Sequence, residues 1–264
     1  MLLALSGFLF EDRYRAQSVP FARFCRIARS AGYGGVELRR TQIAPDAPAA
    51  RRRELLDIVR GEGLTVTCLT ARGLPDRGDE RDAFFDRYLG LCADLECRLL
   101  KISSDPAWLR NAAERAQAHG VALAGNNHVG TDLQTASGTR RLLSQVGHRN
   151  YGLLYDSAHL HMAGEDYLSC IPPLLPHMRN VLVHSFRRAA GGEPPFLTHD
   201  GQGWGTALPD APCVQDWPAI LSACRRHGYD GLITVIESGW SAARREAVAR
   251  HNADCIRRWW GRAS

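Results

Sequence analysis

The sequence predicts an α/β protein of the (β/α)8, or TIM-barrel, class, and three observations support this prediction. Eight short apolar runs recur along the 264-residue chain, with helix-like segments between several of them. The runs are continuously apolar and do not alternate with polar residues, which is typical of strands that helices cover on both faces. Eight strand–helix units of about 30 residues each reach the usual size of such a barrel, about 250 residues.

The eight predicted strands are rich in Val, Ile and Leu. In chain order they occupy residues 2–10, 34–40, 64–72, 98–104, 121–125, 151–154, 180–183 and 232–236. The first run is apolar but only about ten residues long, and Glu11 and Asp12 follow it directly, so it is too short to span a membrane. We therefore interpret it as the first strand.

Four segments between the strands place apolar residues at helical spacing. They are residues 19–32, 46–63, 80–97 and 106–120. Gly32, Gly63 and Gly120 stand near the ends of three of them, where glycine commonly caps a helix. With 45% hydrophobic residues and no stretch that resembles a linker, the chain is expected to form a single domain over residues 1–264.

Charge and cysteine usage limit the partners and the compartment. The formal net charge is +5, but the arginines are scattered along predicted helices and are not interleaved with aromatic residues, so we expect no nucleic-acid partner. The eight cysteines form no CxxC pair. We expect buried free thiols and a cytoplasmic location, because disulfides are rare in reducing compartments.

Polar side chains stand at or just beyond the ends of six predicted strands. They are Glu37, Lys101, Asn126 to His128, Asp156 with His159, His184 with Arg187, and Glu237. In a barrel the carboxyl ends of the strands form the active face, so these side chains are expected to converge on one metal ion or one substrate. A lone Glu or Lys at a strand end is often only a solvated or paired group, which leaves that alternative open for Glu37 and Lys101. An enzyme is the leading interpretation.

The order of the motifs resembles a known family. It reads N-N-H-x-G from Asn126, L-L-Y-D-S-A-H ending at His159, V-L-V-H ending at His184, and a long run from Asp216 through G-Y-D-G to Glu237, with A-G-Y-G-G-V-E-L near the start. This order is similar to the xylose-isomerase-like TIM barrels. That superfamily includes sugar and sugar-phosphate isomerases and epimerases, dehydratases and apurinic endonucleases.

The resemblance implies a divalent metal site with one departure from the family pattern. Asp156, His184 and Glu237 match three of the family's four ligands, but Asn126 stands where relatives carry a fourth, a glutamate. An amide oxygen is a weaker ligand for a hard cation than a carboxylate. We expect Mn, Mg, Co or Zn to be held weakly with Asn126 as a ligand or close neighbour, and the alternative is a barrel without a functional metal.

Further residues are expected to contact a small polar substrate. Arg187 stands where relatives carry an acid, and its guanidinium fork suits a carboxylate or a phosphate, although a plain surface arginine is the alternative. Residues 191–214 form a long Gly-rich stretch that predicts a mobile lid. Trp204 and Trp240 would then wall the pocket, and Asn127, His128, Glu37 and Lys101 complete the expected contacts. Trp259 and Trp260 are expected to pack the last helix or to form a homodimer contact.

The leading functional hypothesis is an isomerase or dehydratase that removes a proton next to a carbonyl in a keto-sugar, cyclitol or keto-acid. Glu237 is the expected base, with His159 or His184 as acid or orienting group. Because Asn126 cannot accept a proton, we rank isomerase or dehydratase above epimerase. One alternative is a non-catalytic barrel that serves as a binding or scaffold subunit. The other, an apurinic endonuclease, lacks the histidines it needs after strands two and three, where Arg39, Arg40 and Arg72 stand.

Overall fold

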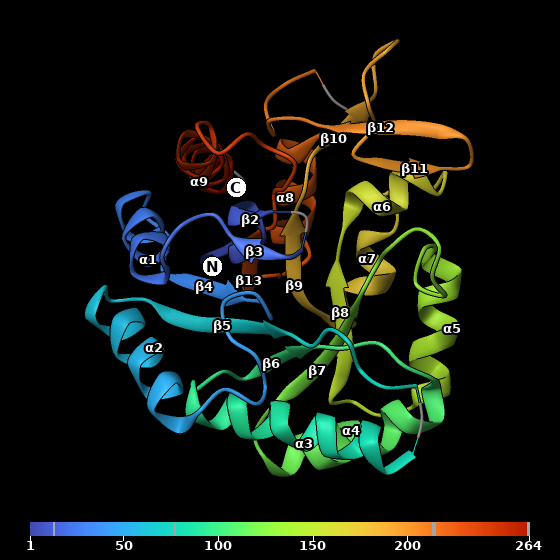
Figure 1. Ribbon diagram of the computed structural model, residues 1–264. Helices are drawn as coiled ribbons and strands as arrows, with labels where there is room; N and C mark the ends of the chain where they lie inside the picture. Colours follow the sequence, from blue (N-terminus) through green and yellow to red (C-terminus); the bar gives the residue numbers. More distant parts are fainter. Residues whose placement is uncertain (13, 77, 213–214, 263–264) are drawn as a thin grey trace.

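Eight parallel strands close into a barrel in the order β1-β13-β9-β8-β7-β6-β5-β4 (Figure 1). The structure is a computed structural model that describes residues 1–12, 14–76, 78–212 and 215–262. The barrel strands are β1 (Leu2–Ser6), β4 (Gly35–Leu38), β5 (Thr65–Thr70), β6 (Leu99–Lys101), β7 (Ala122–Asn126), β8 (Tyr151–Tyr155), β9 (Met178–Val183) and β13 (Leu232–Val235). Each overlaps one of the eight predicted strands, so the prediction of a TIM barrel is confirmed.

Helices surround the barrel and cover the outer faces of its strands. They are α1 (Phe21–Ser30), α2 (Ala49–Gly61), α3 (Gly78–Asp94), α4 (Pro106–Ala118), α5 (Ala136–Val146), α6 (Ser157–Met162), α7 (Ile171–Leu174), α8 (Trp217–Arg226) and α9 (Arg245–Arg262), with a 3-10 turn at Leu175–His177. The four predicted helices correspond to α1 to α4. The glycines predicted as caps, Gly32, Gly63 and Gly120, all have positive φ angles, of 82°, 67° and 67°, which glycine adopts without a steric penalty.

The first predicted strand is shorter than expected. β1 ends at Ser6, and the apolar residues after it form a 3-10 helix, Gly7–Phe10, whose start is capped by the Ser6 hydroxyl accepting from the Phe8 amide. The short antiparallel pair β2 (Glu11–Asp12) and β3 (Ala16–Gln17) follows. A continuous apolar run does not separate a strand from a buried turn of helix, and this turn brings Phe8 and Glu11 to the mouth of the barrel.

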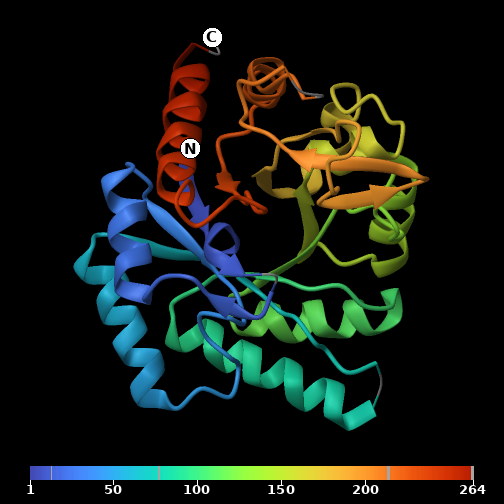
Figure 2. The ribbon, with the colours of Figure 1, turned by 45° about the horizontal axis from the view of Figure 1, so that its top comes forward.

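A small antiparallel sheet begins just before the predicted lid and includes part of it. Its strands are β10 (Phe186–Arg188), β11 (Leu197–His199) and β12 (Gln202–Thr206), in the order β10-β12-β11. Both views show it standing beyond the end of β9 (Figures 1 and 2). Asp200 and Gly201 link β11 to β12 with φ angles of 46° and 74°, a pair of left-handed residues that suits a two-residue hairpin turn. The mobility predicted for residues 191–214 stays a prediction, and residues 213–214 of the predicted lid lie outside the described residues.

Two apolar layers hold the barrel together. One layer lies between strands and helices, and a smaller cluster fills the barrel interior with Phe8, Cys68, Leu99, Ala124, Leu154, Leu182 and Ile236. The seven described cysteines are all buried and free, as predicted, while Cys213 lies outside the described residues. Trp259 and Trp260 pack partly buried against the first layer. Within the described ranges, every helix is too short or too polar to cross a lipid bilayer.

Candidate active site

A cavity of about 660 Å³ opens at the carboxyl end of the barrel. Six of the residues predicted for the site line it: Lys101, Asn126, His128, Asp156, His159 and His184. They come from β6, β7, the start of α6 and the segments after β7, β8 and β9. The convergence expected at the strand ends is therefore present for these six residues.

Asp156, His159 and His184 form a compact group of possible metal ligands. Asp156 directly follows β8 and caps α6, where its Oδ1 accepts from the Ala158 and His159 amides at 3.2 and 3.5 Å. The cap places His159 in the first turn of α6, and His184 directly follows β9. One donor atom from each of the three lies within 4.8 Å of the other two.

Burial determines the charge of this group. It raises the pKa of Asp156 to about 7, lowers that of His184 to about 3 and lowers that of His159 well below its ordinary value. Among the described residues, the nearest basic group to the Asp156 carboxylate is the neutral His159 ring, at 3.8 Å. A buried carboxylate between two neutral imidazoles is a donor set that suits a divalent transition metal. The residues thus fit a metal ion better than they fit the role of a protonated acid expected for the histidines.

Two of the predicted metal ligands, Glu237 and Asn126, are not part of the observed donor group. The Glu237 carboxylate is fully buried, accepts from the Ser185 amide at 3.2 Å and the Trp240 indole at 3.4 Å, and lies outside the donor group. Burial raises its pKa to about 8. Asn126 lines the cavity while its Nδ2 donates to the Asn127 carbonyl. Its role as a ligand stays a prediction, and His159 supplies a third donor that the predicted ligand set did not include.

Two predicted contact residues are held inside the protein. Asn127 is buried, and its Nδ2 donates to the Leu133 carbonyl at 2.8 Å and the Thr139 hydroxyl at 3.0 Å, so it ties the segment after β7 to α5. Glu37 is also buried and accepts from the Thr70 hydroxyl at 2.9 Å. Neither residue lines the cavity, and both serve the local structure.

Three further predicted contacts lie away from this cavity. Arg187 forms a bidentate pair with Glu193 at 2.7 and 2.8 Å, so its fork is already occupied. Trp204 is buried in an apolar cluster with Phe186, behind the cavity wall. Trp240 lines a neighbouring hollow of about 490 Å³, which shares Phe8, Tyr14, Pro195 and Phe196 with the cavity, but it does not line the cavity itself. The structure therefore does not bring these three side chains into the cavity.

Lys101 is the basic side chain from a barrel strand that reaches the cavity. Burial lowers its pKa, and the carboxylate of Glu37 opposes this effect. No described residue forms a hydrogen bond or an ion pair with its ammonium group. Beside it, the His128 ring lies 4.0 Å from that of His159, centroid to centroid, and burial lowers the His128 pKa as well.

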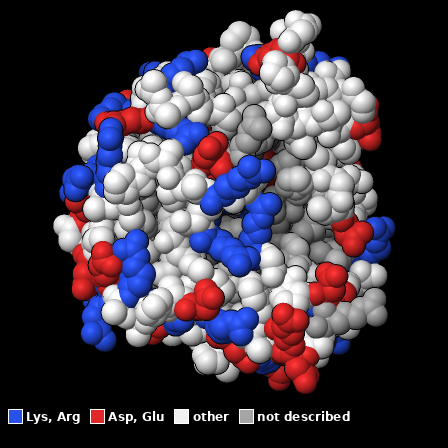
Figure 3. Space-filling view, viewed as in Figure 1, with Lys and Arg blue, Asp and Glu red and all other residues white. Residues whose placement is uncertain are grey.

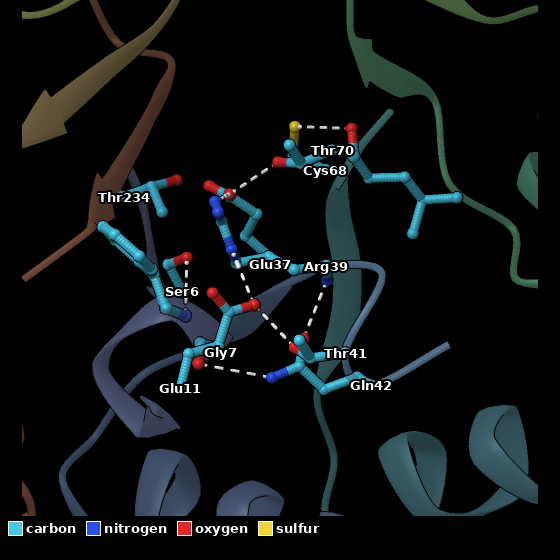
Figure 4. A network of polar contacts seen from close by, with 12 residues as sticks. Ser6, Gly7, Glu11, Glu37, Arg39, Thr41, Gln42, Cys68, Thr70 and Thr234 are labelled. Carbon is cyan, nitrogen blue, oxygen red and sulfur yellow. Dashed lines mark hydrogen bonds and ion pairs between the residues drawn. The ribbon is translucent and has the colours of Figure 1, made fainter. Parts of the chain in front are cut away.

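Arg39 and several aromatic side chains also line the cavity, although none of them was among the predicted site residues. Arg39 directly follows β4 and stands two residues after Glu37, and Arg39 lines the cavity whereas Glu37 does not. The Arg39 guanidinium lies 4.3 Å from the centre of the Phe8 ring and bonds to Glu11 at 2.9 Å. Figure 4 shows this network, with Glu37 beside it. The position of Arg39 just beyond a strand end was the available signal.

The aromatic wall surrounds the donor group with apolar surface. It consists of Phe8, Tyr14, Phe186 and Phe196. The Phe186 ring lies 4.0 Å from the His184 ring and stacks on Phe196 at 5.8 Å. Phe196 comes from the hairpin segment, which had been expected to contribute Trp204. Phe8 and Phe186, the two buried rings of this wall, add apolar surface beside the ionisable groups.

Comparison with known proteins places the chain in a family. A family model described as a xylose isomerase-like TIM barrel matches residues 25–259. An inosose dehydratase from Mesomycoplasma hyopneumoniae is 26% identical over 122 residues, which are 44% of this chain and 40% of that protein. This match spans less than half the length of that relative.

Two solved structures share the whole architecture at low sequence identity. The probable 3-DHS dehydratase AsbF from Bacillus anthracis is 15% identical with a TM-score of 0.76, covering 97% of this chain and 99% of that one. The IOLI protein with a bound zinc atom is 16% identical with a TM-score of 0.76, covering 100% and 99%. At these identities the likeness establishes the fold alone. With the family match over most of its length, the chain belongs to the xylose isomerase-like TIM barrel family.

Proposed function

We propose that the protein is an isomerase or dehydratase that removes a proton next to the carbonyl of a small keto-sugar, cyclitol or keto-acid. The observation that carries this proposal is the group of Asp156, His159 and His184 in one cavity with Lys101. A relative described as an inosose dehydratase and a structural neighbour described as a probable 3-DHS dehydratase support this proposal. A divalent metal bound by the three residues would polarise the carbonyl and stabilise the negative charge that develops on its oxygen.

Lys101 is the best-placed base for this reaction. A lowered pKa increases the fraction of neutral amine near neutral pH, which a general base requires. Its ammonium group has no partner among the described residues, whereas both oxygens of Glu237 accept hydrogen bonds and Glu237 is not among the residues that line the cavity. We therefore assign proton abstraction to Lys101 and a structural role to Glu237.

A single base on one face of the substrate limits the possible reactions. The proton that Lys101 takes from carbon can return to a neighbouring carbon, which gives an isomerase. It can also pass to a hydroxyl leaving from the same face, which gives a syn dehydratase. Neither route needs a second base, and the Asn126 amide, which also lines the cavity, cannot accept a proton. This keeps epimerisation the less favoured reaction.

The direct test is turnover by the metal-supplemented protein. We would assay inososes, 3-dehydroshikimate and keto-sugars with Mn, Mg, Co or Zn, and follow each reaction by NMR in deuterated water. Deuterium should enter at one carbon with one stereochemistry at the rate of turnover. A barrel that binds these compounds without exchange would instead be the non-catalytic binding protein.

Changing Asn126 to glutamate tests the metal site directly. Asn126→Glu adds a carboxylate to the cavity that holds the donor group, so Mn affinity should rise tenfold or more, on the order of the effects known for groups around metal sites. Isothermal titration of the metal-free proteins measures this. Asn150→Asp is the control, because Asn150 lies near the other end of the barrel, where its Nδ2 donates to backbone carbonyls. Equal affinities in Asn126→Glu and wild type would remove Asn126 from the metal site.

A further inference from the structure

A second hollow adjoins the reaction cavity. Its volume is about 400 Å³, and it shares Tyr14 and Arg39 with the larger cavity. Its walls come from the β2–β3 hairpin and from the segments after β4 and β5. We call this hollow the basic annex, because four arginines line it: Arg15, Arg39, Arg40 and Arg72.

The charges of the basic annex do not cancel. Glu11 is the acid among its lining residues, and that carboxylate already bonds to Arg39 at 2.9 Å and to the Thr41 hydroxyl at 2.5 Å. Arg15, Arg40 and Arg72 are exposed and form no ion pair with a described acid. Figure 3 shows Lys and Arg side chains gathered near the middle of this face. Like charges that converge on a hollow repel one another and raise the local concentration of anions.

Several arginines on the outer helices are paired with acids. Arg52 pairs with Asp94 at 2.8 Å, Arg60 with Glu96 at 2.6 Å, and Arg115 with Asp82 at 2.8 Å. The side chains of these three arginines are therefore neutralised by acids of the chain itself. Arg15, Arg40 and Arg72 of the basic annex lack such partners among the described residues, and an external anion would take their place.

The arginines of the basic annex are positioned by their neighbours. The Arg72 guanidinium lies 4.1 Å from the centre of the Tyr14 ring, an arrangement that fixes the plane of the fork. The Arg40 guanidinium lies against Gly73, where an added Cβ would come within 2.7 Å of its NH1 atom. Gly73, with a φ of 80°, thus leaves room for Arg40. Both forks are held beside the opening that Tyr14 and Arg39 share with the reaction cavity.

We propose that the substrate carries an anionic group, a phosphate or a carboxylate, which the basic annex binds through Arg40 and Arg72 while the carbonyl end occupies the larger cavity. This inference rests on the proposed function and names the substrate class. Planar guanidinium forks bind both kinds of anion with two parallel hydrogen bonds. Arg187, which the sequence suggested for this task, is occupied by Glu193.

The test measures anion binding without turnover. Inorganic phosphate and malonate would be titrated calorimetrically into the whole, metal-free protein, into an Arg40→Gln/Arg72→Gln double variant and into Arg53→Gln. Arg53 is exposed on α2 and lines neither cavity, so it is the matched control. The double variant should bind at least tenfold more weakly and Arg53→Gln as wild type does. Tighter binding of phosphate indicates a phosphorylated substrate, and tighter binding of malonate indicates a carboxylate; both support the proposal.

Three other outcomes are informative about the proposed anion site. Wild-type affinity in the double variant, or no binding to the wild type at millimolar concentrations, would leave the basic annex without a ligand. Lys101→Met should keep wild-type phosphate binding, and a loss as large as that of the double variant would place the anion in the reaction cavity. These measurements of anion binding do not depend on catalysis. If the protein binds the anion through the basic annex but turns over no keto compound, the proposed function is refuted while the anion site is supported.

Discussion

Replacing Lys101 with methionine is expected to lower kcat by roughly 10²- to 10⁴-fold, the usual contribution of a general base. The KM should change little, because the proposed role concerns the chemical step. Methionine keeps the length and apolar stem of lysine, so the barrel should fold normally. Stopped-flow or steady-state assays on the best substrate measure this effect, and small primary amines should restore part of the activity of Lys101→Ala.

The pH dependence of kcat/KM shows whether Lys101 acts as a base or only contributes positive charge to the cavity. Activity that depends on neutral Lys101 rises with pH as its ammonium group loses a proton. The Glu37 carboxylate raises the Lys101 pKa, so Glu37→Gln should lower that pKa and move the acid limb of kcat/KM to lower pH. If the acid limb of the kcat/KM profile does not move in Glu37→Gln, or if Glu237→Gln loses as much activity as Lys101→Met, Glu237 would be the base.

The barrel could be predicted from the sequence because its signal is repeated and local. Buried parallel strands need continuous apolar runs, and helices need a 3.6-residue period, often with glycine after the last turn. The eight strands and four of the helices could therefore be recognised from the sequence. The small sheet over the barrel was missed for the opposite reason. Its strands are only three to five residues long, and their signal was a single Asp200-Gly201 turn within a Gly-rich segment.

The candidate site could be predicted by position but not by contact. Strand ends correctly indicated Lys101, Asp156, His159 and His184, because chain direction fixes which end of a parallel strand reaches the active face. Whether a side chain at that end enters the cavity depends on neighbours distant in sequence. Glu37 bonds to Thr70 and Arg187 to Glu193, while Arg39 reaches the opening. Such pairings depend on the tertiary fold, and the spacing along one strand does not contain them.

Removing the Glu237 carboxyl is expected to stabilise the metal-free protein at high pH. Burial raises the Glu237 pKa from 4.5 to about 8. Below pH 4.5 the carboxyl is protonated in both the folded and the unfolded chain. Between pH 4.5 and 8 it ionises in the unfolded chain only, so the folded state loses stability as pH rises. Glutamine does not titrate, so the stability of Glu237→Gln relative to wild type should rise by roughly 3–5 kcal/mol from pH 5 to pH 8.5.

Urea unfolding in EDTA at several pH values measures this difference, and Glu54→Gln, which removes an exposed carboxylate, supplies the baseline. The Ser185 amide can still bond to the glutamine oxygen, and the lost bond from Trp240 lowers stability equally at every pH. A difference that stays flat with pH would mean that Glu237 is ionised in the folded protein. Repeating the series with saturating Mn then decides its role. A ligand carboxylate would make the wild type more stable than the variant at pH 8, whereas a structural Glu237 would leave the difference as it was in EDTA.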